Sequence, residues 1–268
     1  MREPAVAAVV LAAGKGKRIG HPHLPKALLP LDGRPLLDYV LSQLLHLSLQ
    51  RVLVVVGFRG EQVVEYLREH FPAVESVWQA EQLGTGHAVW QTAPQLQGFP
   101  GDVLVLPADI PLVRAQSLEQ LIRAHRTHGA SVSVLTTRMP DPTGYGRIVR
   151  DPSGAFLRIV EERDASPEER ALQEVNTGIL LARAEWLYRL LPELRPENAQ
   201  REYYLTDLVA LCRHRGAPVW AELVPDWEQF QGVNTWEELE RVAALLRQMR
   251  QGRRHTAEPQ SCPSSRDA

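Results

Sequence analysis

A segment near the N-terminus, residues 11–31, combines glycine with positive charge in a pattern that suits phosphate binding. It holds every lysine of the 268-residue chain, namely Lys15, Lys17 and Lys26. Gly14 and Gly16 allow backbone N–H groups to approach a ligand, and a glycine-rich turn after a strand commonly cradles phosphate. The glycine spacing matches neither a Rossmann fingerprint nor a Walker A loop. A solvated basic loop would have the same composition, so this segment alone leaves both interpretations open.

Asp109 is a second candidate, because it ends an apolar run at residues 102–109. A carboxylate at the end of a buried strand can anchor Mg²⁺ beside a nucleotide, since this metal needs only one or two protein oxygens besides phosphate oxygens and water. An aspartate in this position can also be a turn former or a helix cap. Taken alone, Asp109 leaves these alternatives equally open.

The first half of the chain alternates between strand-like and helix-like patterns. Apolar runs typical of buried strands occupy residues 5–13, 51–57, 74–80 and 102–109. Segments with helical spacing follow them at residues 35–47, 61–70, 86–97 and 117–129. This alternation predicts βαβ units and an α/β fold with a doubly wound, mostly parallel sheet. Ligands bind beyond the carboxyl ends of such strands, so we expect segments 11–31, 79–88 and 107–112 to meet there.

Further strands are predicted after residue 130, where the alternation changes. They lie at residues 130–138, at 176–182, and in two pieces within 145–162 that are joined by a turn at 151–154. We expect them to extend the sheet, which is then mixed, and to wall one side of the cleft.

Two later segments have helical spacing, residues 206–216 and 235–250. Thr206 or Asp207 can cap the start of the first of these helices. Residues 1–250 are predicted to form one domain. The polar composition of residues 251–268 predicts a disordered tail.

The composition excludes several classes of protein. Apolar residues make up 44% and charged residues 23% of the chain, the ordinary range for a soluble globular protein. A net charge of −2 provides no general attraction to nucleic acid or to an anionic membrane. The apolar run at residues 5–13 is too short to span a membrane. The two cysteines, Cys212 and Cys262, imply no disulfide framework, and we expect a cytoplasmic location.

Eight segments of the chain match one known family in the family's own order over residues 5–245. They are VVLAAGKGKRIG (9–20), LPKALLPLDGRPLLDYVL (24–41), QAEQLGTGHAV (79–89), DPTGYGRIVR (141–150), IVEERDA (159–165), EVNTGIL (174–180), EYYLTD (202–207) and GVNTWEEL (232–239). The chain thereby resembles the N-acetylglucosamine-1-phosphate uridylyltransferase family, the pyrophosphorylase half of the bifunctional bacterial enzyme that makes UDP-N-acetylglucosamine. LAAGxGxR marks the wider sugar nucleotidyltransferase superfamily, whereas EQLGTGHA, DPTGYGRI and EYYLTD are narrower.

The resemblance implies a Rossmann-like nucleotidyltransferase fold and a Mg²⁺-dependent reaction. A sugar 1-phosphate oxygen would attack the α-phosphorus of UTP in line, and pyrophosphate would leave. By resemblance, Arg18 and Lys26 are catalytic, because they would neutralise charge on the phosphates. Residues that match nucleotide-binding positions are Leu11, Ala12, Ala13, Gly14, Lys26, Gln79, Gly84, Thr85 and Asp109.

The same resemblance assigns the acceptor and the metal. Asp109 and Asn234 match Mg²⁺ ligands, one through a carboxylate oxygen and the other through an amide oxygen. Residues that match positions around the sugar and its phosphate are Gly146, Glu161, Asn176, Tyr204, Thr206 and Asn234.

The chain also departs from the family pattern. Pro107 and Ala108 precede Asp109 where the family has an aromatic or small residue and then glycine. We expect the methyl group of Ala108 to lie where the backbone would approach the ligand. Among the properties that the resemblance implies, substrate preference is therefore the one that this change affects most. No hexapeptide-repeat acetyltransferase half follows residue 250, so we expect neither acetyl-CoA chemistry nor the trimer which that half builds. A separate acetyltransferase would then be a partner, and the oligomeric state stays open.

Two alternatives to uridylyl transfer remain at this stage. One is a pyrophosphorylase of the same fold that uses another sugar 1-phosphate or another nucleotide. The other is a regulator that binds nucleotide sugars without catalysis. The presence of all four functional residues, Arg18, Lys26, Asp109 and Asn234, disfavours the regulator.

Overall fold

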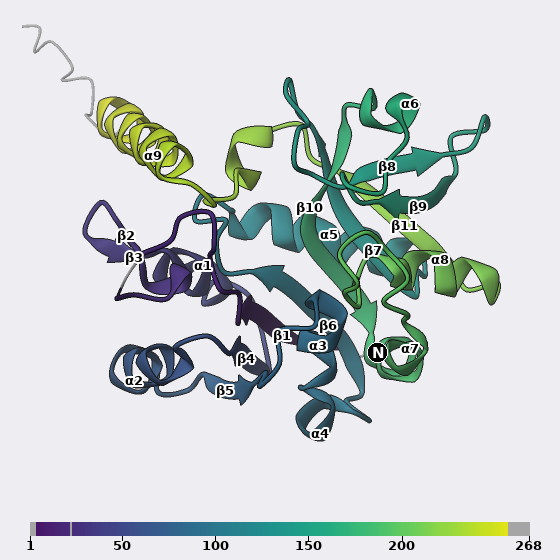
Figure 1. Ribbon diagram of the computed structural model, residues 1–268, viewed down its shortest axis with the longest axis horizontal. Coiled ribbons are helices and arrows are strands. Elements are labelled where there is room, and N and C mark those ends of the chain that lie inside the picture. The colour runs from purple at the N-terminus through teal and green to yellow at the C-terminus, as the bar shows by residue number, and fades with distance from the viewer. Residues whose placement is uncertain (1–3, 22, 257–268) are drawn as a thin grey trace, which may run out of the picture.

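A mixed β-sheet with helices on both faces organises the protein (Figure 1). The computed structural model describes residues 4–21 and 23–256, with side chains up to Gln251. The sheet has nine strands, and seven of them form a continuous path in the order β11-β7-β10-β6-β1-β4-β5. The predicted α/β class and the doubly wound, mostly parallel but mixed sheet are confirmed.

Four parallel strands form the half of the sheet that the first part of the chain builds. β1 (Ala5–Ala12) lies between β6 (Gly101–Pro107) and β4 (Arg51–Val56), and β5 (Glu75–Trp78) forms one edge. The helices between and after these strands are α1 (Leu36–Leu44), α2 (Gly60–His70), α3 (Thr85–Trp90), α4 (Ala93–Leu96) and α5 (Ala115–Thr127). The carboxyl ends of β1 and β6 therefore share one edge of the sheet.

The other half of the sheet reverses direction at β10 (Glu174–Arg183). This strand is antiparallel to both of its neighbours, β6 and β7 (Val132–Arg138). β11 (Val219–Leu223) pairs with β7 in parallel, and a hairpin of β8 (Arg147–Arg150) and β9 (Phe156–Val160) branches from β10. The remaining helices are α6 (Pro167–Arg170), α7 (Ala184–Leu190), α8 (Asp207–His214) and α9 (Trp236–Thr256).

Short elements complete the chain. A two-stranded ribbon joins β2 (Pro30–Leu31) to β3 (Arg34–Pro35). Three short 3₁₀ turns are η1 (Lys26–Leu28), η2 (Leu191–Glu193) and η3 (Trp227–Phe230).

Two apolar cores cover the two faces of the sheet, because successive side chains of a strand point to opposite sides. On β1, Ala7 and Val9 belong to the core beneath α3, α4, α7 and α8. Ala8 and Val10 belong to the core beneath α1, α2 and α5. Burial on both faces explains the near-continuous apolar run that predicted this strand.

The predicted helix at residues 86–97 is wrong in one respect, since the segment forms two short helices. α3 ends at Trp90, and α4 starts again at Ala93 with a proline in its first turn. The hydroxyl of Thr92 donates a 2.6 Å hydrogen bond to Val89 O at the break. A proline lacks the N–H that a continuous helix would need, so the helix restarts here.

Helix α9 runs six residues past its predicted end at Arg250, so the boundary predicted for the tail is wrong by that length. Gly252 does not stop the helix, because one glycine costs only about 1 kcal/mol relative to alanine. The rest of the predicted tail, residues 257–268, lies outside the described residues. Within the described part of the chain, no helix combines the length and the apolar character that crossing a membrane requires.

Candidate active site

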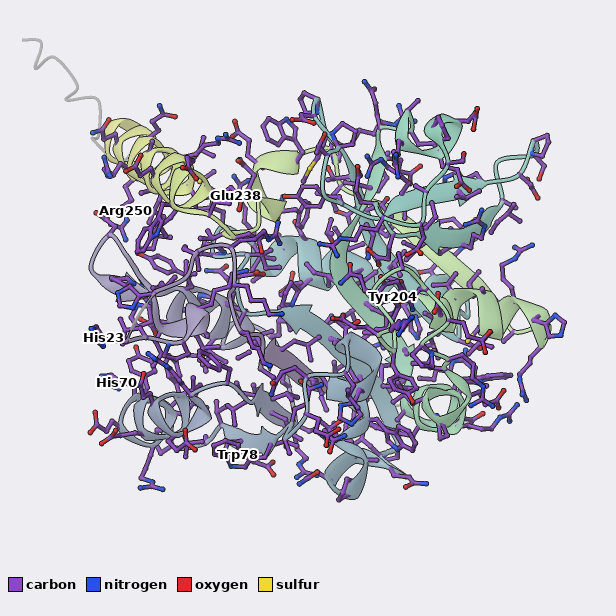
Figure 2. All side chains as sticks on the ribbon, in the orientation of Figure 1. His23, His70, Trp78, Tyr204, Glu238 and Arg250 are labelled. Carbon is purple, nitrogen blue, oxygen red and sulfur yellow. The ribbon has the colours of Figure 1, made fainter. Side chains whose placement is uncertain are left out.

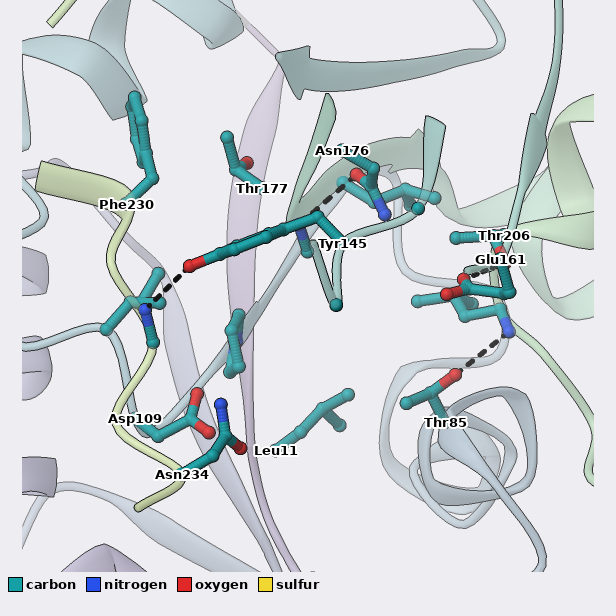
Figure 3. A pocket seen from close by; sticks show the side chains of 18 of the residues that line it. Leu11, Thr85, Asp109, Tyr145, Glu161, Asn176, Thr177, Thr206, Phe230 and Asn234 are labelled. Carbon is teal, nitrogen blue, oxygen red and sulfur yellow. Dashed lines mark hydrogen bonds between the residues drawn. The ribbon is translucent and has the colours of Figure 1, made fainter. Parts of the chain in front are cut away.

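A cavity of about 270 Å³ lies at the edge of the sheet where β1 and β6 end (Figure 3). The antiparallel strand β10 starts at this same edge, so its first residues also reach the cavity. Residues that were predicted to bind ligand and that line the cavity are Leu11, Arg18, Thr85, Asp109, Gly146, Glu161, Asn176, Thr206 and Asn234. The structure therefore brings these predicted residues together at one edge of the sheet.

Three residues that are far apart in the sequence, Lys26, Asp109 and Asn234, meet beside the cavity. Lys26 Nζ forms an ion pair with Asp109 Oδ2 and donates a 2.7 Å hydrogen bond to Asn234 Oδ1. All three residues are partly buried, so solvent screens this interaction less than it would at the surface. We call these three residues the cation cluster. Its two oxygen atoms already share one cation, and oxygen ligands of this kind suit Mg²⁺.

The glycine-rich loop between β1 and η1 folds against Lys26. Gly16 has φ of +57°, and a Cβ at this position would lie 3.1 Å from the Cβ of Lys26. Gly20 N donates a 2.9 Å hydrogen bond to Gly16 O, which closes the turn. Arg18 is exposed and lines the cavity. The loop thus brings Arg18 to the cavity that Lys26 borders.

Residues Leu11 to Gly14 lead from the sheet into this loop. Leu11 lines the cavity, Ala12 and Ala13 are buried in opposite cores, and Gly14 is exposed. Leu11 O accepts a 3.0 Å hydrogen bond from the backbone N of the residue before Asp109. This bond ties the start of the loop to the strand end that carries the carboxylate. Nucleotide contact by Ala12, Ala13 and Gly14 stays a prediction.

The loop with the predicted nucleotide-binding residues Gln79, Gly84 and Thr85 is tied to the segment before α8. Gln79 is buried, and its Nε2 donates a 3.1 Å hydrogen bond to Gly84 O. Gly84 has φ of +112°, and a Cβ there would lie 2.7 Å from Tyr203 O, so the position requires glycine. Thr85 Oγ1 accepts a 3.0 Å hydrogen bond from Leu205 N. Thr85 lines the cavity, whereas Gln79 and Gly84 shape the loop from behind.

Glu161 and Thr206 form the side of the cavity away from the cation cluster. Thr206 Oγ1 donates a 2.9 Å hydrogen bond to Glu161 Oε1. Burial raises the pKa of Glu161, and the neighbouring Asp207 and Asp164 act in the same direction. Of the two residues predicted as possible caps of α8, Thr206 occupies the N-cap position but makes no side-chain cap hydrogen bond, because its hydroxyl is directed to Glu161.

Gly146 and Asn176 complete this side, which we call the Glu161 wall (Gly146, Glu161, Asn176 and Thr206). A Cβ at Gly146 would lie 3.0 Å from Ile159 Cγ2 and 3.4 Å from Glu161 Oε2, so glycine mainly avoids crowding against Ile159 and stays in ordinary contact distance of the carboxylate. Asn176 lies where the register between β10 and β7 shifts, and its Oδ1 accepts a 3.2 Å hydrogen bond from Gly178 N. Such an irregularity re-aims a side chain, and the glycine inside the apolar strand pattern was its signal.

Tyr204 lies in the interior and does not line the cavity, contrary to the prediction from the resemblance. Figure 2 labels Tyr204 among the side chains of the molecule. The residue is 8% exposed, and burial raises the pKa of its hydroxyl. The backbone of the preceding residue explains this placement. Tyr203 N donates to Leu83 O (2.8 Å), and Tyr203 O accepts from Gly86 N (2.7 Å). These bonds fix the segment so that the next side chain is turned inward.

The expectation that the methyl group of Ala108 approaches the ligand is wrong. Ala108 is 3% exposed and packs into the core beneath α1, α2 and α5. Pro107 lines the cavity instead. Neighbouring residues of an extended chain face opposite sides, so the substitution before Asp109 places a proline ring, and not a methyl group, on the cavity.

Sequence reasoning missed several residues that line the cavity, and Tyr145 and Glu238 are two of them. Tyr145 Oη accepts a 3.3 Å hydrogen bond from Gly232 N, and burial raises the pKa of this tyrosine. Glu238 and Thr235 form reciprocal side-chain to backbone bonds at the start of α9. The text Thr-x-x-Glu before an apolar helix is a capping box, and this signal could have identified Glu238.

Comparison with known proteins identifies the family. Residues 8–251 match the family described as the MobA-like NTP transferase domain. The chain is 45% identical over 245 residues to the bifunctional protein GlmU of Pelobacter propionicus and 50% identical over 243 residues to that of Thermus thermophilus. Each alignment covers 90% of this chain and 52% of the relative, so the chain spans about half the length of these relatives.

A solved structure from Bacillus anthracis, called a glucose-1-phosphate thymidylyltransferase, has the same fold. Its TM-score is 0.72 at 20% identity, and the match covers 91% of this chain and 96% of that one. Together with the cavity at the carboxyl edge and the cation cluster beside it, these matches show that the chain belongs to the MobA-like NTP transferase domain family.

Proposed function

We propose that this protein transfers a uridylyl group from UTP to N-acetylglucosamine 1-phosphate, which yields UDP-N-acetylglucosamine and pyrophosphate. An oxygen of the sugar 1-phosphate forms a bond to the α-phosphorus of UTP, and the bond to the pyrophosphate oxygen breaks. Such a transfer depends on positioning and charge stabilisation, with little covalent work for the protein. The GlmU relatives and the order of the sequence motifs support this choice of substrates.

The cation cluster is the observation that carries the proposal. Phosphoryl transfer leaves negative charge on the phosphate oxygens, and preorganised positive charge stabilises it. Lys26 lies beside the cavity and Arg18 lines it, so both can reach phosphates bound at the end of β1. We assign to them the neutralisation of the triphosphate.

Asp109 and Asn234 are the residues that would hold Mg²⁺. Their oxygen atoms both contact Lys26 Nζ, so the pair is already arranged around one positive charge. When bound, Mg²⁺ would neutralise phosphate charge and orient the triphosphate. The protein's own part is to present two oxygens, at the side of the cavity next to the glycine-rich loop.

The Glu161 wall is assigned to the sugar. Glu161, Asn176 and Thr206 present hydrogen-bonding groups to the cavity, and these groups suit the hydroxyl and amide groups of an N-acetylated sugar. Glu161 is held in place by Thr206, so its position is fixed before a ligand arrives. The wall therefore orients the acceptor, while the opposite side neutralises the phosphates.

The remaining partners follow from this assignment. UTP and a sugar 1-phosphate are the proposed substrates, and nucleic acid and membranes are not. We place the reaction in the cytoplasm, which fits a buried, unpaired Cys212.

Pyrophosphate release tests the proposal. The purified protein is incubated with Mg²⁺, one nucleoside triphosphate and one sugar 1-phosphate at a time, and pyrophosphate is measured. We expect release with UTP and N-acetylglucosamine 1-phosphate. Release only with another pair would show that the protein catalyses the same type of transfer with other substrates. Binding of UDP-sugars without release from any pair would support a regulator instead.

A further inference from the structure

The segment Gly232–Thr235 carries Asn234, and each of its backbone N–H groups is held by another residue. Gly232 N donates to Tyr145 Oη (3.3 Å), and Val233 N donates to Asp109 O (2.9 Å). The next two N–H groups, of Asn234 and Thr235, both donate to Glu238 Oε2. Four consecutive N–H groups are thus fixed from three directions.

This arrangement sets the position of Asn234 relative to Asp109. The bond from Val233 N to Asp109 O joins the two backbones directly beside the two side chains. The bonds on either side of it keep the segment from turning about that link. The amide oxygen of Asn234 is therefore held beside the carboxylate of Asp109, and both oxygens contact Lys26.

We propose that Glu238 and Tyr145 are positioning residues, which hold Asn234 in the geometry that a divalent cation requires; this inference rests on the proposed function. Both residues line the cavity, and their proposed role involves no direct bond to the metal. Residues that orient a metal ligand commonly affect metal affinity almost as much as the ligands themselves. Figure 3 shows Tyr145 extending across the cavity toward Gly232.

Glu238 is expected to contribute more than Tyr145. Its carboxylate accepts two backbone hydrogen bonds, and bonds to an ionised acceptor are about twice as strong as bonds between neutral groups. Tyr145 makes one longer bond between neutral groups. The structure therefore predicts an order of effects, with Glu238→Ala first and Tyr145→Phe second.

Binding of Mn²⁺, a paramagnetic substitute for Mg²⁺, tests the proposal in the 268-residue chain. We expect Glu238→Ala to weaken Mn²⁺ binding by about 10- to 100-fold. Glu238→Gln keeps an acceptor oxygen and should recover part of the loss, and Tyr145→Phe should lose less than Glu238→Ala. Electron paramagnetic resonance gives the free Mn²⁺ concentration, and the Mg²⁺ concentration for half-maximal pyrophosphate release provides a second readout.

A second capping box in the same chain provides the matched control. Ser166 and Glu169 form this motif at the start of α6, away from the cavity. Glu169→Ala removes a capping glutamate of the same kind, so it should lower thermal stability without changing Mn²⁺ affinity. If Glu169→Ala and Glu238→Ala changed Mn²⁺ affinity equally, the effect of Glu238 would be general helix stability and the proposal would be wrong.

The remaining outcomes separate this inference from the proposed function. Wild-type pyrophosphate release combined with unchanged Mn²⁺ affinity in Glu238→Gln, Glu238→Ala and Tyr145→Phe would overturn the positioning role alone. A loss of Mn²⁺ affinity in the order given, without pyrophosphate release from any substrate pair, would support the positioning role and overturn the proposed reaction. If Glu238→Ala does not fold, the Mn²⁺ affinities of Glu238→Gln and Tyr145→Phe test the positioning role, because each of these substitutions removes fewer side-chain atoms.

Discussion

The two sides of the cavity handle charge in opposite ways. In the cation cluster, the carboxylate of Asp109 is paired with Lys26. In the Glu161 wall, the charged neighbours that act on the carboxylate, Asp207 and Asp164, are themselves acidic, and burial raises its pKa. One side thus suits phosphate, for which a positive charge is ready. The other suits a neutral sugar, whose hydroxyl groups can donate to a carboxylate that forms no ion pair with any residue the structure describes. The difference assigns the two ends of the substrate pair to the two sides.

Removing the cation from the first side should have the largest effect. Lys26→Ala deletes the ammonium group that contacts Asp109 and Asn234, so the triphosphate would lose preorganised positive charge. We expect kcat for pyrophosphate release to fall by about 10²- to 10³-fold, the usual effect of losing one such group. Steady-state kinetics measure this fall, and circular dichroism checks that the fold is retained.

Arg51→Ala is the control for Lys26→Ala. Arg51 forms an ion pair with Glu75 and donates a hydrogen bond to Gln95 O, and none of these three residues lines the cavity. We expect turnover within about twofold of wild type. Near-normal turnover in Lys26→Ala would mean that the cation cluster is not where the phosphates bind.

Glu161→Gln should affect the second substrate only. The substitution replaces a carboxylate acceptor with a neutral amide and leaves the cation cluster unchanged. A hydrogen bond to a charged group contributes about 1.5–3 kcal/mol, so the KM for sugar 1-phosphate should rise by about 10- to 100-fold. The KM for UTP should stay near its wild-type value, as measured with each substrate varied in turn. An equal rise in both KM values would contradict the assignment of the two sides.

The same substitution changes how stability depends on pH. Folding raises the pKa of Glu161, so its ionised form is less favourable in the folded than in the unfolded protein. The contribution of this carboxyl to the free energy of unfolding of the wild type is therefore fully present below the pKa of the unfolded carboxyl. It is lost as the pH rises through the pKa of the folded state. Relative to wild type, Glu161→Gln should gain stability as the pH rises above 4.5, the ordinary pKa of a glutamate carboxyl, as measured by urea unfolding. A difference that stays constant with pH would mean that Glu161 titrates normally.

Sequence reasoning succeeded where strand direction decides the position of a residue. The parallel strands bring Asp109 to the same edge as the glycine-rich loop whatever the details of packing, so this meeting was predictable. It failed where the orientation of one side chain depends on hydrogen bonds made elsewhere. Tyr204 is turned inward by the backbone bonds of Tyr203, and the hydroxyl of Thr206 bonds Glu161 instead of capping α8.

Tyr145 and Glu238 were not predicted as site residues for a related reason. Tyr145 acts on Gly232, which lies 87 residues further along the chain, and no local pattern indicates this contact. Glu238 was detectable as part of a capping box, but its second role requires the position of Asn234 in space. Local rules thus predict helix ends, whereas bonds between distant segments require the structure.

The smallest effect is expected at Ala108, which adjoins the cation cluster but faces away from the cavity. Ala108→Gly removes a methyl group from the core beneath α1, α2 and α5, and it adds backbone freedom to the unfolded chain. Each of these changes costs up to about 1 kcal/mol, so the free energy of unfolding should fall by about 1–2 kcal/mol. The ratio of kcat/KM between different sugar 1-phosphates should not change.

Pro107→Ala is the comparison for Ala108→Gly, because Pro107 lines the cavity one residue earlier. Removing its ring should mainly change the ratio of kcat/KM between sugar 1-phosphates, and its effect on the free energy of unfolding should be minor. The pair of variants therefore separates a side chain that lines the substrate site from one that supports the core. If Ala108→Gly altered sugar selectivity and Pro107→Ala did not, the methyl group of Ala108 would reach the substrate, and the side of the chain that faces the cavity would be wrongly assigned.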